Sequence, residues 1–227
     1  MRPPFTGEVD EISFFPYPSL TETVAKVRRY VAGDYRVLLV TGEAGSGKTL
    51  LVKQILALDE TRWKVANLSL EHGASLRVYA MEMGELPTIL IDDAHLLEPE
   101  VLASLVKLTS EEEGERRLQQ LVIFGAPRLS RQVDTLRHLM PPRDSVMEVG
   151  VPAMEMEEVR TYISGHLRSA GHSGVVPFTD GQIERIHTLS KGLPGRVNRE
   201  AAKELSRLTE KSVPAQKKGL FGRFFGR

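Results

Sequence analysis

The chain has 227 residues, of which 41% are hydrophobic and 26% charged, so it can bury the core of one large domain or two small ones. Its 30 basic and 30 acidic residues cancel, which argues against a general attraction to nucleic acid or to acidic surfaces. The absence of cysteine excludes disulfides, thiol catalysis and cysteine-ligated metals. No apolar run approaches the ~20 residues that cross a bilayer, and we expect a soluble cytoplasmic protein.

The first segments of the chain predict a loop, a helix and a strand. Residues 1–18 are rich in proline and aromatic side chains, and we interpret them as an N-terminal loop laid across the core. Ser19 and Glu22 have the spacing of a capping box, which predicts a helix over residues 23–31. Residues 36–41 are mostly apolar and are expected to form the first strand of a sheet.

A glycine-rich loop follows this strand directly. Its residues are Gly42, Glu43, Ala44, Gly45, Ser46, Gly47, Lys48 and Thr49, and Leu50 continues into an apolar helix. The spacing is that of the phosphate-binding loop, in which backbone N–H groups and a helix N-terminus surround a polyphosphate. We predict that residues 42–50 bind a nucleoside triphosphate, with Lys48 on the β- and γ-phosphates and the Thr49 hydroxyl on Mg²⁺.

Strands and helices continue to alternate up to residue 150. Further apolar runs predict strands at residues 63–68, 88–91, 121–124 and 146–149, and a helix is expected at residues 98–108. The charged segment 111–117 is interpreted as a solvated loop. Apolar strands that alternate with helices are typical of a parallel sheet covered on both faces. The prediction is therefore an α/β fold, a P-loop NTPase core with a parallel five-stranded sheet.

Two aspartates follow the predicted strand at residues 88–91. An apolar run that ends in an acid is the Walker B pattern, which places the first acid at the carboxyl end of a strand, facing Mg²⁺. We therefore predict that Asp92 is a metal ligand together with Thr49. Without the phosphate loop, a strand that ends in a solvated turn would explain the same residues equally well. His95 is interpreted as a partly buried structural histidine.

From Val151 onward the pattern is helical throughout. Helices are expected at residues 155–170, 179–190 and 194–208, with capping residues, glycines or prolines at their ends. Three short helices after an α/β core predict a lid. The expected organisation is an N-terminal loop (1–18), a nucleotide-binding core (19–150), a helical lid (151–210) and a basic-aromatic tail (211–227).

The last residues of this tail combine aromatic side chains with cations. Leu220, Phe221, Phe224 and Phe225 would share one face of a helix, and two lysines and two arginines accompany them. This combination suits weak contact with an anionic membrane surface. Three glycines in the same segment oppose a helix in water, so a disordered tail or one that docks on a protein partner is the alternative.

Motifs at the end of the core and in the lid resemble those of a known family. After the strand at residues 121–124 comes Gly125-Ala126-Pro127-Arg128-Leu129, and the lid carries Phe178-Thr179 and then Gly192-Leu193-Pro194-Gly195-Arg196-Val197-Asn198. With the phosphate loop, these segments resemble AAA+ ATPases of the general-secretion A type (ExeA/GspA-like) and the ATPase portions of related pilus-biogenesis and DamX-like proteins. The resemblance covers about residues 37–208. It implies an AAA+ core with a lid, ATP and Mg²⁺ as ligands, and homo-oligomers that depend on ATP.

The resemblance also implies roles for single residues. Arg196 matches the sensor-2 arginine, which reaches from the lid to the γ-phosphate. Arg143 is the best match to an arginine finger for a neighbouring subunit, with Arg137 nearly as good. Asp93 stands where the family has a glutamate that activates water, and Ala126 replaces a polar sensor-1 residue. The predicted catalytic residues are therefore Asp93, Arg196 and Arg143. The shorter carboxylate of Asp93 is pulled back, and a shift of ~1 Å can cost on the order of 10²-fold in rate, so hydrolysis limited by Asp93 and Ala126 is expected to be slow.

Three functional hypotheses follow from the sequence. The first is an ATPase or nucleotide switch that supports an envelope-associated machine for secretion, pilus formation or division, from the cytoplasm or at the periphery of the inner membrane. The second is an ATP-dependent DNA-binding accessory protein of the transposition or initiator kind, against which the neutral net charge argues. The third is a non-catalytic adaptor that holds ATP, which Asp93 and Ala126 favour.

Overall fold

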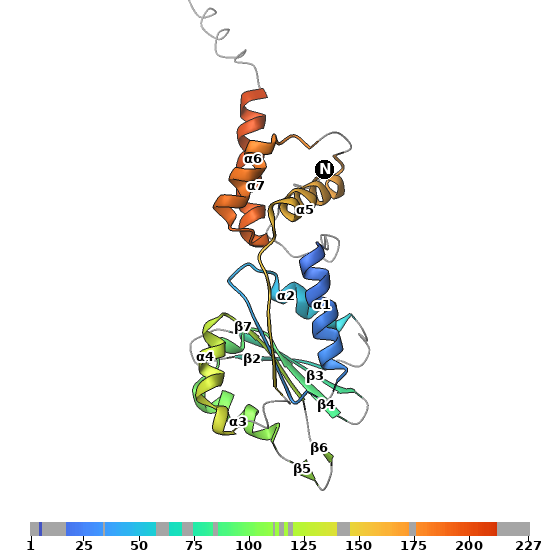
Figure 1. Cartoon of the computed structure of the whole chain (residues 1–227), viewed down its shortest axis with the longest axis vertical. Coiled ribbons are helices and arrows are strands. Elements are labelled where there is room, and N and C mark those ends of the chain that lie inside the picture. Colours follow the sequence, from blue (N-terminus) through green and yellow to red (C-terminus); the bar gives the residue numbers. More distant parts are fainter. Residues whose placement is uncertain are drawn as a thin grey trace, which may run out of the picture.

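The chain folds into an α/β core with a group of helices above it (Figure 1). The computed structural model describes residues 5, 17–33, 35–57, 64–69, 75–83, 86–110, 112–113, 116–117, 120–139, 146–172 and 176–212. The helices are α1 (Pro18–Val31), α2 (Lys48–Leu56), α3 (Pro99–Leu108), α4 (Arg128–Thr135), α5 (Met156–Ser169), α6 (Asp180–Ser190) and α7 (Pro194–Ser212), with short 3-10 turns η2 (Ala94–Leu96) and η3 (Arg137–Leu139). The strands are β1 (Val37–Thr41), β2 (Lys64–Ser69), β3 (Ser75–Met83), β4 (Leu86–Ile91), β5 (Glu112–Glu113), β6 (Arg116–Arg117), β7 (Gln120–Gly125) and β8 (Val146–Gly150).

Six strands form the central sheet, in the order β2-β3-β4-β7-β1-β8. The neighbours β4, β7, β1 and β8 are parallel, which confirms the α/β prediction. β3 is antiparallel to both of its neighbours, so the sheet has a sixth, antiparallel strand that the expected parallel five-stranded sheet did not include. The five expected strands run in one direction, and β3 is inserted between β2 and β4. The connections at residues 70–74 and 84–85 are too short for the crossover that parallel neighbours need.

Helices cover both faces of this sheet, and alternate residues of its strands supply the two hydrophobic cores. Leu38 and Val40 of β1 pack in the core that contains residues of α1 and α2, whereas Leu39 packs in the core that contains residues of α3 and α4. β7 divides in the same way, with Phe124 on the first side and Ile123 on the second. Each large side chain buried in this way contributes ~1.5–3 kcal/mol, so the cores hold in place the strands whose carboxyl ends carry the site.

The start of α1 differs from the sequence prediction. The helix begins at Pro18, which occupies its first turn, and Tyr17 is the residue before it, so Ser19 is not a capping residue. The Ser19 N–H donates to Oε1 of Glu158 in α5 at 2.7 Å, and the Ser19 hydroxyl donates to Oε2 at 3.0 Å. A carboxylate 139 positions away in the chain thus satisfies this helix end and joins the core to the lid.

The charged segment 111–117 also differs from the solvated loop expected there. β5 and β6 form an antiparallel pair, with Glu112 opposite Arg117 and Glu113 opposite Arg116.

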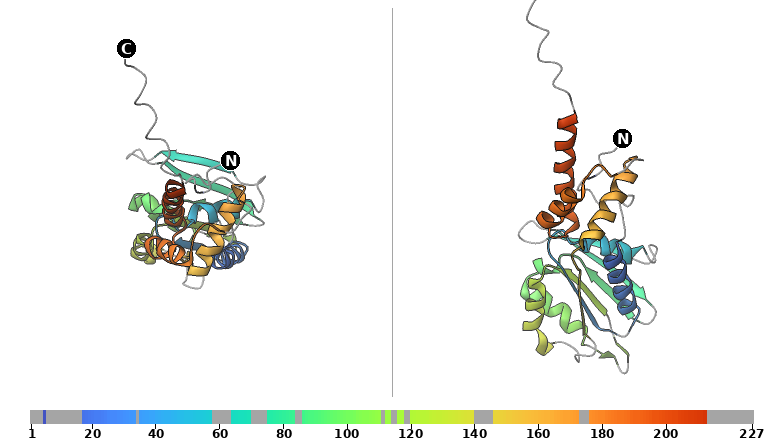
Figure 2. Two further views of the ribbon diagram at one scale, coloured as in Figure 1. Left: turned by 90° about the horizontal axis from the view of Figure 1, so that it is seen from above. Right: turned by 45° about the horizontal axis from the view of Figure 1, so that its top comes forward.

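The lid consists of α5, α6 and α7, and their positions confirm the three helices expected there. Capping boxes at Glu155 and Thr179 begin α5 and α6. α7 continues to Ser212, past its expected end near residue 208, and takes in the first two residues assigned to the tail. Figure 2 (right) shows α7 extending upward, away from the sheet.

Aromatic residues from the N-terminal side pack against the lid helix α5. The ring of Tyr17 meets that of Tyr162 edge to face at 6.2 Å, and Phe5 lies 5.9 Å from His166. Burial raises the pKa of Tyr162 to about 12, although a hydrogen bond from Asn198 opposes the shift. The chain before α1 therefore contacts the lid at both of its described residues.

Several predictions concern residues outside the described ranges. Arg143, residues 213–227 of the tail and most of the N-terminal loop are among them, and the division of the chain into four parts stays a prediction. Among the helices of the described residues, none is both long and apolar enough to span a membrane.

Candidate nucleotide-binding site

The glycine-rich loop joins the buried strand β1 to α2, at the carboxyl edge of the parallel strands (Figure 1). Gly45 and Gly47 have φ angles of 83° and 98°, a left-handed conformation that residues with side chains rarely adopt. Gly47 is the residue before α2, and Lys48 is the first residue of that helix. The glycines therefore let the backbone turn sharply into the N-terminus of α2, where N–H groups and the helix dipole favour an anion.

Lys48 is folded back onto this loop. Its ammonium Nζ donates to the carbonyl oxygens of Gly42 at 2.8 Å and Glu43 at 3.0 Å, and the residue is 8% exposed. Burial lowers the pKa of Lys48, and the negative charges of Asp93, Asp92 and Glu43 oppose that shift. The cation is thus held in the loop by carbonyl groups that phosphate oxygens can replace.

The two predicted metal ligands are in contact. The Thr49 side chain hydrogen-bonds the carboxylate of Asp92, which lies directly after β4 and is 4% exposed. Burial raises the pKa of Asp92, the charge of Asp93 raises it further, and the bonds from Thr49 and from the Asp93 N–H, at 3.0 Å, oppose the rise. A hydroxyl and a carboxylate are hard oxygen ligands of the kind that Mg²⁺ prefers.

These two side chains fit a magnesium ion that takes its remaining ligands from phosphates and water. Within the described part of the chain, no group of three or more histidine, cysteine, aspartate or glutamate side chains could hold a metal by itself. Mg²⁺ is usually held by one or two carboxylates plus substrate phosphates, so one carboxylate beside a phosphate loop is the expected ligand set.

Asp93 lies beside this pair in a left-handed backbone conformation, with φ of 55° and ψ of 31°. Its carboxylate Oδ1 is 3.9 Å from Nδ1 of His95, whose side chain is 16% exposed, as expected for a partly buried histidine. Burial lowers the pKa of His95, and the positive charges of Arg128 and Lys48 lower it further, while Asp93 opposes them. The imidazole therefore lies among charged groups of the site, although the sequence favoured a purely structural role.

The lid contacts the phosphate loop at Gly195, in the first turn of α7. The Gly195 N–H donates to the carbonyl oxygen of Gly45 at 3.0 Å, and a Cβ on Gly195 would lie 3.3 Å from the Gly45 Cα. Arg196 follows directly and is half-buried in the first turn of α7. The structure therefore brings the segment with the predicted sensor arginine to the loop, whereas Arg143 lies outside the described residues.

Two contacts of the site were not foreseen from the sequence. The first is the backbone bond between Gly195 and Gly45, and the second is a bond from Arg128 Nη2 to the carbonyl oxygen of His95 at 3.1 Å. The available signal for Arg128 was its place directly after the turn that ends β7, two residues beyond Ala126.

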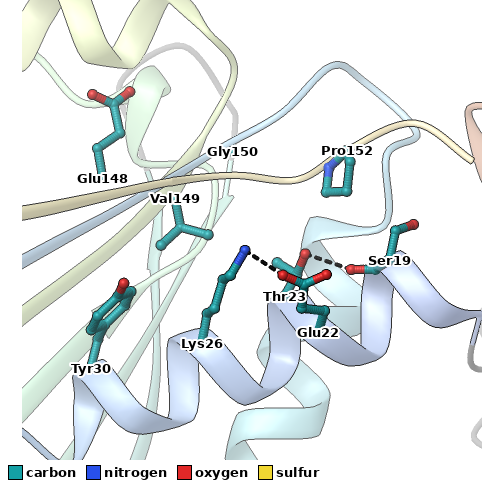
Figure 3. A pocket seen from close by; sticks show the side chains of 9 residues that line it. All are labelled: Ser19, Glu22, Thr23, Lys26, Tyr30, Glu148, Val149, Gly150 and Pro152. Carbon is teal, nitrogen blue, oxygen red and sulfur yellow. Dashed lines mark hydrogen bonds and ion pairs between the residues drawn. The ribbon is translucent and has the colours of Figure 1, made fainter.

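A cavity of about 470 Å³ lies elsewhere, between α1 and the edge strand β8 (Figure 3). Glu22 and Lys26 of α1 form an ion pair at 2.7 Å on one wall, and Glu148 and Gly150 of β8 lie on the other. None of its lining residues belongs to the phosphate loop or to the Asp92–His95 turn, so this cavity is separate from the candidate nucleotide site.

The chain is similar in sequence to a known secretion protein. No family model matches the chain. Over 192 residues it is 26% identical to General secretion pathway protein A from Aeromonas hydrophila. The predicted resemblance is confirmed. The match covers 71% of this chain and 35% of that relative, so the chain corresponds to about a third of the relative's length.

Solved structures give weaker matches. NtrX from Brucella abortus shares 14% identity with a TM-score of 0.49, over 92% of this chain and 54% of that chain. Hsp104 from S. cerevisiae, in a complex with casein, shares 13% identity with a TM-score of 0.46, over 87% of this chain and 38% of that chain.

Proposed function

We propose that this chain binds Mg²⁺-ATP in the loop at residues 42–50 and acts as an AAA+ ATPase or nucleotide switch with slow hydrolysis. The observation that carries the proposal is the contact between Thr49 and Asp92, next to a lysine held inside a glycine-rich loop. A solvated turn would not need a buried carboxylate bonded to a hydroxyl in the first turn of α2. A metal and triphosphate site needs both groups at this place.

Different residues of the site bind the phosphates and the metal ion. Lys48 exchanges the carbonyl oxygens of Gly42 and Glu43 for phosphate oxygens, and the N-terminus of α2 supplies N–H groups to the same anion. Thr49 and Asp92 hold the metal, and bound Mg²⁺ neutralises part of the triphosphate charge. Arg196, next to the glycine that bonds the loop, reaches from the lid toward the γ-phosphate.

Slow hydrolysis of ATP is expected because of two residues near the predicted position of the attacking water. Asp93 is one methylene shorter than the glutamate usual at a water-activating position, and Ala126 has no polar group to hold that water. The left-handed backbone of Asp93 adds a reason for the short side chain, because Asp and Asn adopt this conformation more readily than longer residues. A non-catalytic adaptor that holds ATP is the second candidate, and the same two residues favour it.

We propose that this activity supports the assembly of an envelope-associated machine. The support is the similarity to General secretion pathway protein A, which covers 71% of this chain but only 35% of that relative. ATP would promote homo-oligomers in which Arg143 of one subunit meets the γ-phosphate of the next. The chain would act from the cytoplasm or at the periphery of the inner membrane, where its basic-aromatic tail adds a weak contact.

Calorimetric titration with Mg²⁺-ATP tests the binding site. Lys48→Ala removes a charge-assisted contact worth about 1.5–3 kcal/mol, so its ATP affinity is expected to fall roughly 10- to 100-fold below that of the wild type. Lys107→Ala, which removes an exposed lysine of α3, is the control and is expected to bind like the wild type. Equal affinities of wild type and Lys48→Ala would contradict the proposed site.

Steady-state phosphate release tests the reason for slow hydrolysis. Asp93→Glu restores the longer carboxylate and is expected to raise turnover, by up to about 10²-fold if ~1 Å of reach is the defect. Asp93→Asn keeps the length and backbone preference but removes the charge, and it is expected to lower turnover. A wild type that already turns over near the median of enzymes, ~10 s⁻¹, would disprove the slow-switch proposal.

A further inference from the structure

We propose that Arg128 contacts the γ-phosphate of bound ATP and so recognises the nucleotide's triphosphate state, a task that Ala126 cannot perform. This inference rests on the proposed ATP-binding function and names a further residue of the same site. Three observations carry it: the place of β7 in the sheet, the bond between Arg128 and His95, and the distribution of charge around Lys48.

The sheet order places Arg128 between the two halves of the site. β7 lies between β1, which leads into the phosphate loop, and β4, which ends at Asp92. The loop and the end of β7 are joined directly, because the Gly42 N–H donates to the carbonyl oxygen of Gly125 at 3.2 Å. Arg128 begins α4 only three residues after Gly125, so its backbone lies at the same carboxyl edge of the sheet as the loop and the metal ligands.

The side chain of Arg128 is directed toward the Asp93 turn. Its Nη2 donates to the carbonyl oxygen of His95 at 3.1 Å, and the His95 ring is 3.9 Å from the Asp93 carboxylate. A guanidinium carries five N–H groups in a planar fork that matches phosphate oxygens, and the bond to His95 uses one of them. This bond therefore holds the fork near the water-activating position and leaves donors for a ligand.

The charges of the site favour a further cation beside Lys48 and Arg196. Three carboxylates, those of Glu43, Asp92 and Asp93, act on the Lys48 ammonium. A triphosphate brings further negative charge, which grows at the transferred phosphoryl oxygens during hydrolysis. Arg128 is exposed, and exposed bonds to a carbonyl oxygen contribute little to folding, so a purely structural role would leave the variant without a nucleotide-specific effect.

The test compares two nucleotides by calorimetry in the full-length protein. Because only the triphosphate carries a γ-phosphate, Arg128→Ala is expected to weaken the non-hydrolysable analogue adenylyl imidodiphosphate roughly tenfold or more, and ADP by less than about twofold. Arg128→Lys keeps the charge without the fork and is expected to lie between wild type and Arg128→Ala. Arg131→Ala removes an exposed arginine one turn further along α4 and is expected to match the wild type for both nucleotides.

Two results would overturn the inference. An equal loss of affinity for both nucleotides would assign Arg128 to the general charge or fold of the site, and no loss for either would remove it from the site. Lys48→Ala, measured in the same series, separates this failure from that of the proposed function. If Lys48→Ala binds weakly and Arg128→Ala binds normally, only the role of Arg128 is wrong, whereas a wild type that binds neither nucleotide refutes both.

Discussion

Replacing Gly192 with alanine is expected to destabilise the protein by about 3–5 kcal/mol, because the change places a methyl group against the backbone of the lid. Gly192 has a φ angle of 68°, and a left-handed conformation costs an L-residue ~1–2 kcal/mol. The added Cβ would lie 2.1 Å from the carbonyl oxygen of Met154 and 2.9 Å from its nitrogen. No rotamer change can relieve a contact between backbone atoms, so the turn itself must move.

That movement would break the joint between the segment before α5 and the turn between α6 and α7. The Met154 N–H donates to the Gly192 carbonyl oxygen at 2.9 Å, and the turn leads within three residues to Gly195, which bonds the phosphate loop. The predicted loss of stability should therefore be accompanied by weaker nucleotide binding. Urea unfolding followed by far-ultraviolet circular dichroism measures the first effect, and calorimetry measures the second.

Gly181→Ala is the matched control for this prediction. Gly181 lies in the first turn of α6, and a Cβ there meets no heavy atom within 4 Å. Alanine favours a helix over glycine, so this variant is expected to be as stable as the wild type or slightly more stable. If the two alanine variants unfold at the same urea concentration, the close approach at Met154 does not constrain the lid.

The phosphate loop and the lid helices could be predicted because their signals are local. Gly45 and Gly47 stand where the backbone of the loop turns left-handed, and Asp92 follows the apolar run that forms strand β4. Thr179 and Gln182 form the capping box that their spacing indicates. In each case, residues within a few positions of one another determine the conformation, so a single sequence contains the necessary information.

The features that escaped prediction depend on distant partners. β3 has no long apolar run, and its place between β2 and β4 follows from pairing with both of them. The carboxylate that bonds the first turn of α1 is that of Glu158, in the lid. Arg128 belongs to the site only because β7 lies between β4 and β1 in the sheet. Sequence spacing gives no access to such neighbours until the topology is known.

Glu158 shows how a distant contact can serve two elements at once. Its carboxylate accepts hydrogen bonds from Ser19 at the start of α1 and from the Glu155 N–H at the start of α5, at 2.9 Å. The core and the lid thus share one capping side chain. Together with the Gly195–Gly45 bond, this contact ties the lid helices to the core at two separate places.

Asp92→Asn is expected to remove Mg²⁺-dependent hydrolysis and, in the absence of nucleotide, to make the protein more stable at neutral pH. Burial and the charge of Asp93 raise the pKa of the Asp92 carboxyl above its usual range. A carboxyl with a raised pKa in the folded state favours folding when it is protonated, so its contribution declines as pH rises from about 4 through the folded-state pKa. The cost of the buried charge is fully present at pH values above the folded-state pKa.

Asparagine has nearly the same shape, keeps an oxygen that can accept the bond from the Asp93 N–H, and carries no charge. The cost of burying the charge therefore disappears, while the metal loses its carboxylate ligand. A metal ion supplies several kcal/mol of transition-state stabilisation, so turnover is expected to fall on the order of 10²- to 10³-fold. The same substitution thus has opposite effects on stability and activity.

Thermal unfolding at pH 7 and pH 4.5, with and without Mg²⁺-ATP, measures the effects on stability and on nucleotide binding. Steady-state phosphate release measures the turnover. Without nucleotide, Asp92→Asn should unfold at a higher temperature than the wild type at pH 7, and the difference should shrink at the lower pH. Mg²⁺-ATP should stabilise the wild type more than the variant, because binding to the folded state raises its stability. Glu184→Gln, which neutralises an exposed carboxylate of α6, should behave like the wild type throughout. A variant that is less stable than the wild type at pH 7 without nucleotide would show that the Asp92 charge supports the empty site instead of opposing it.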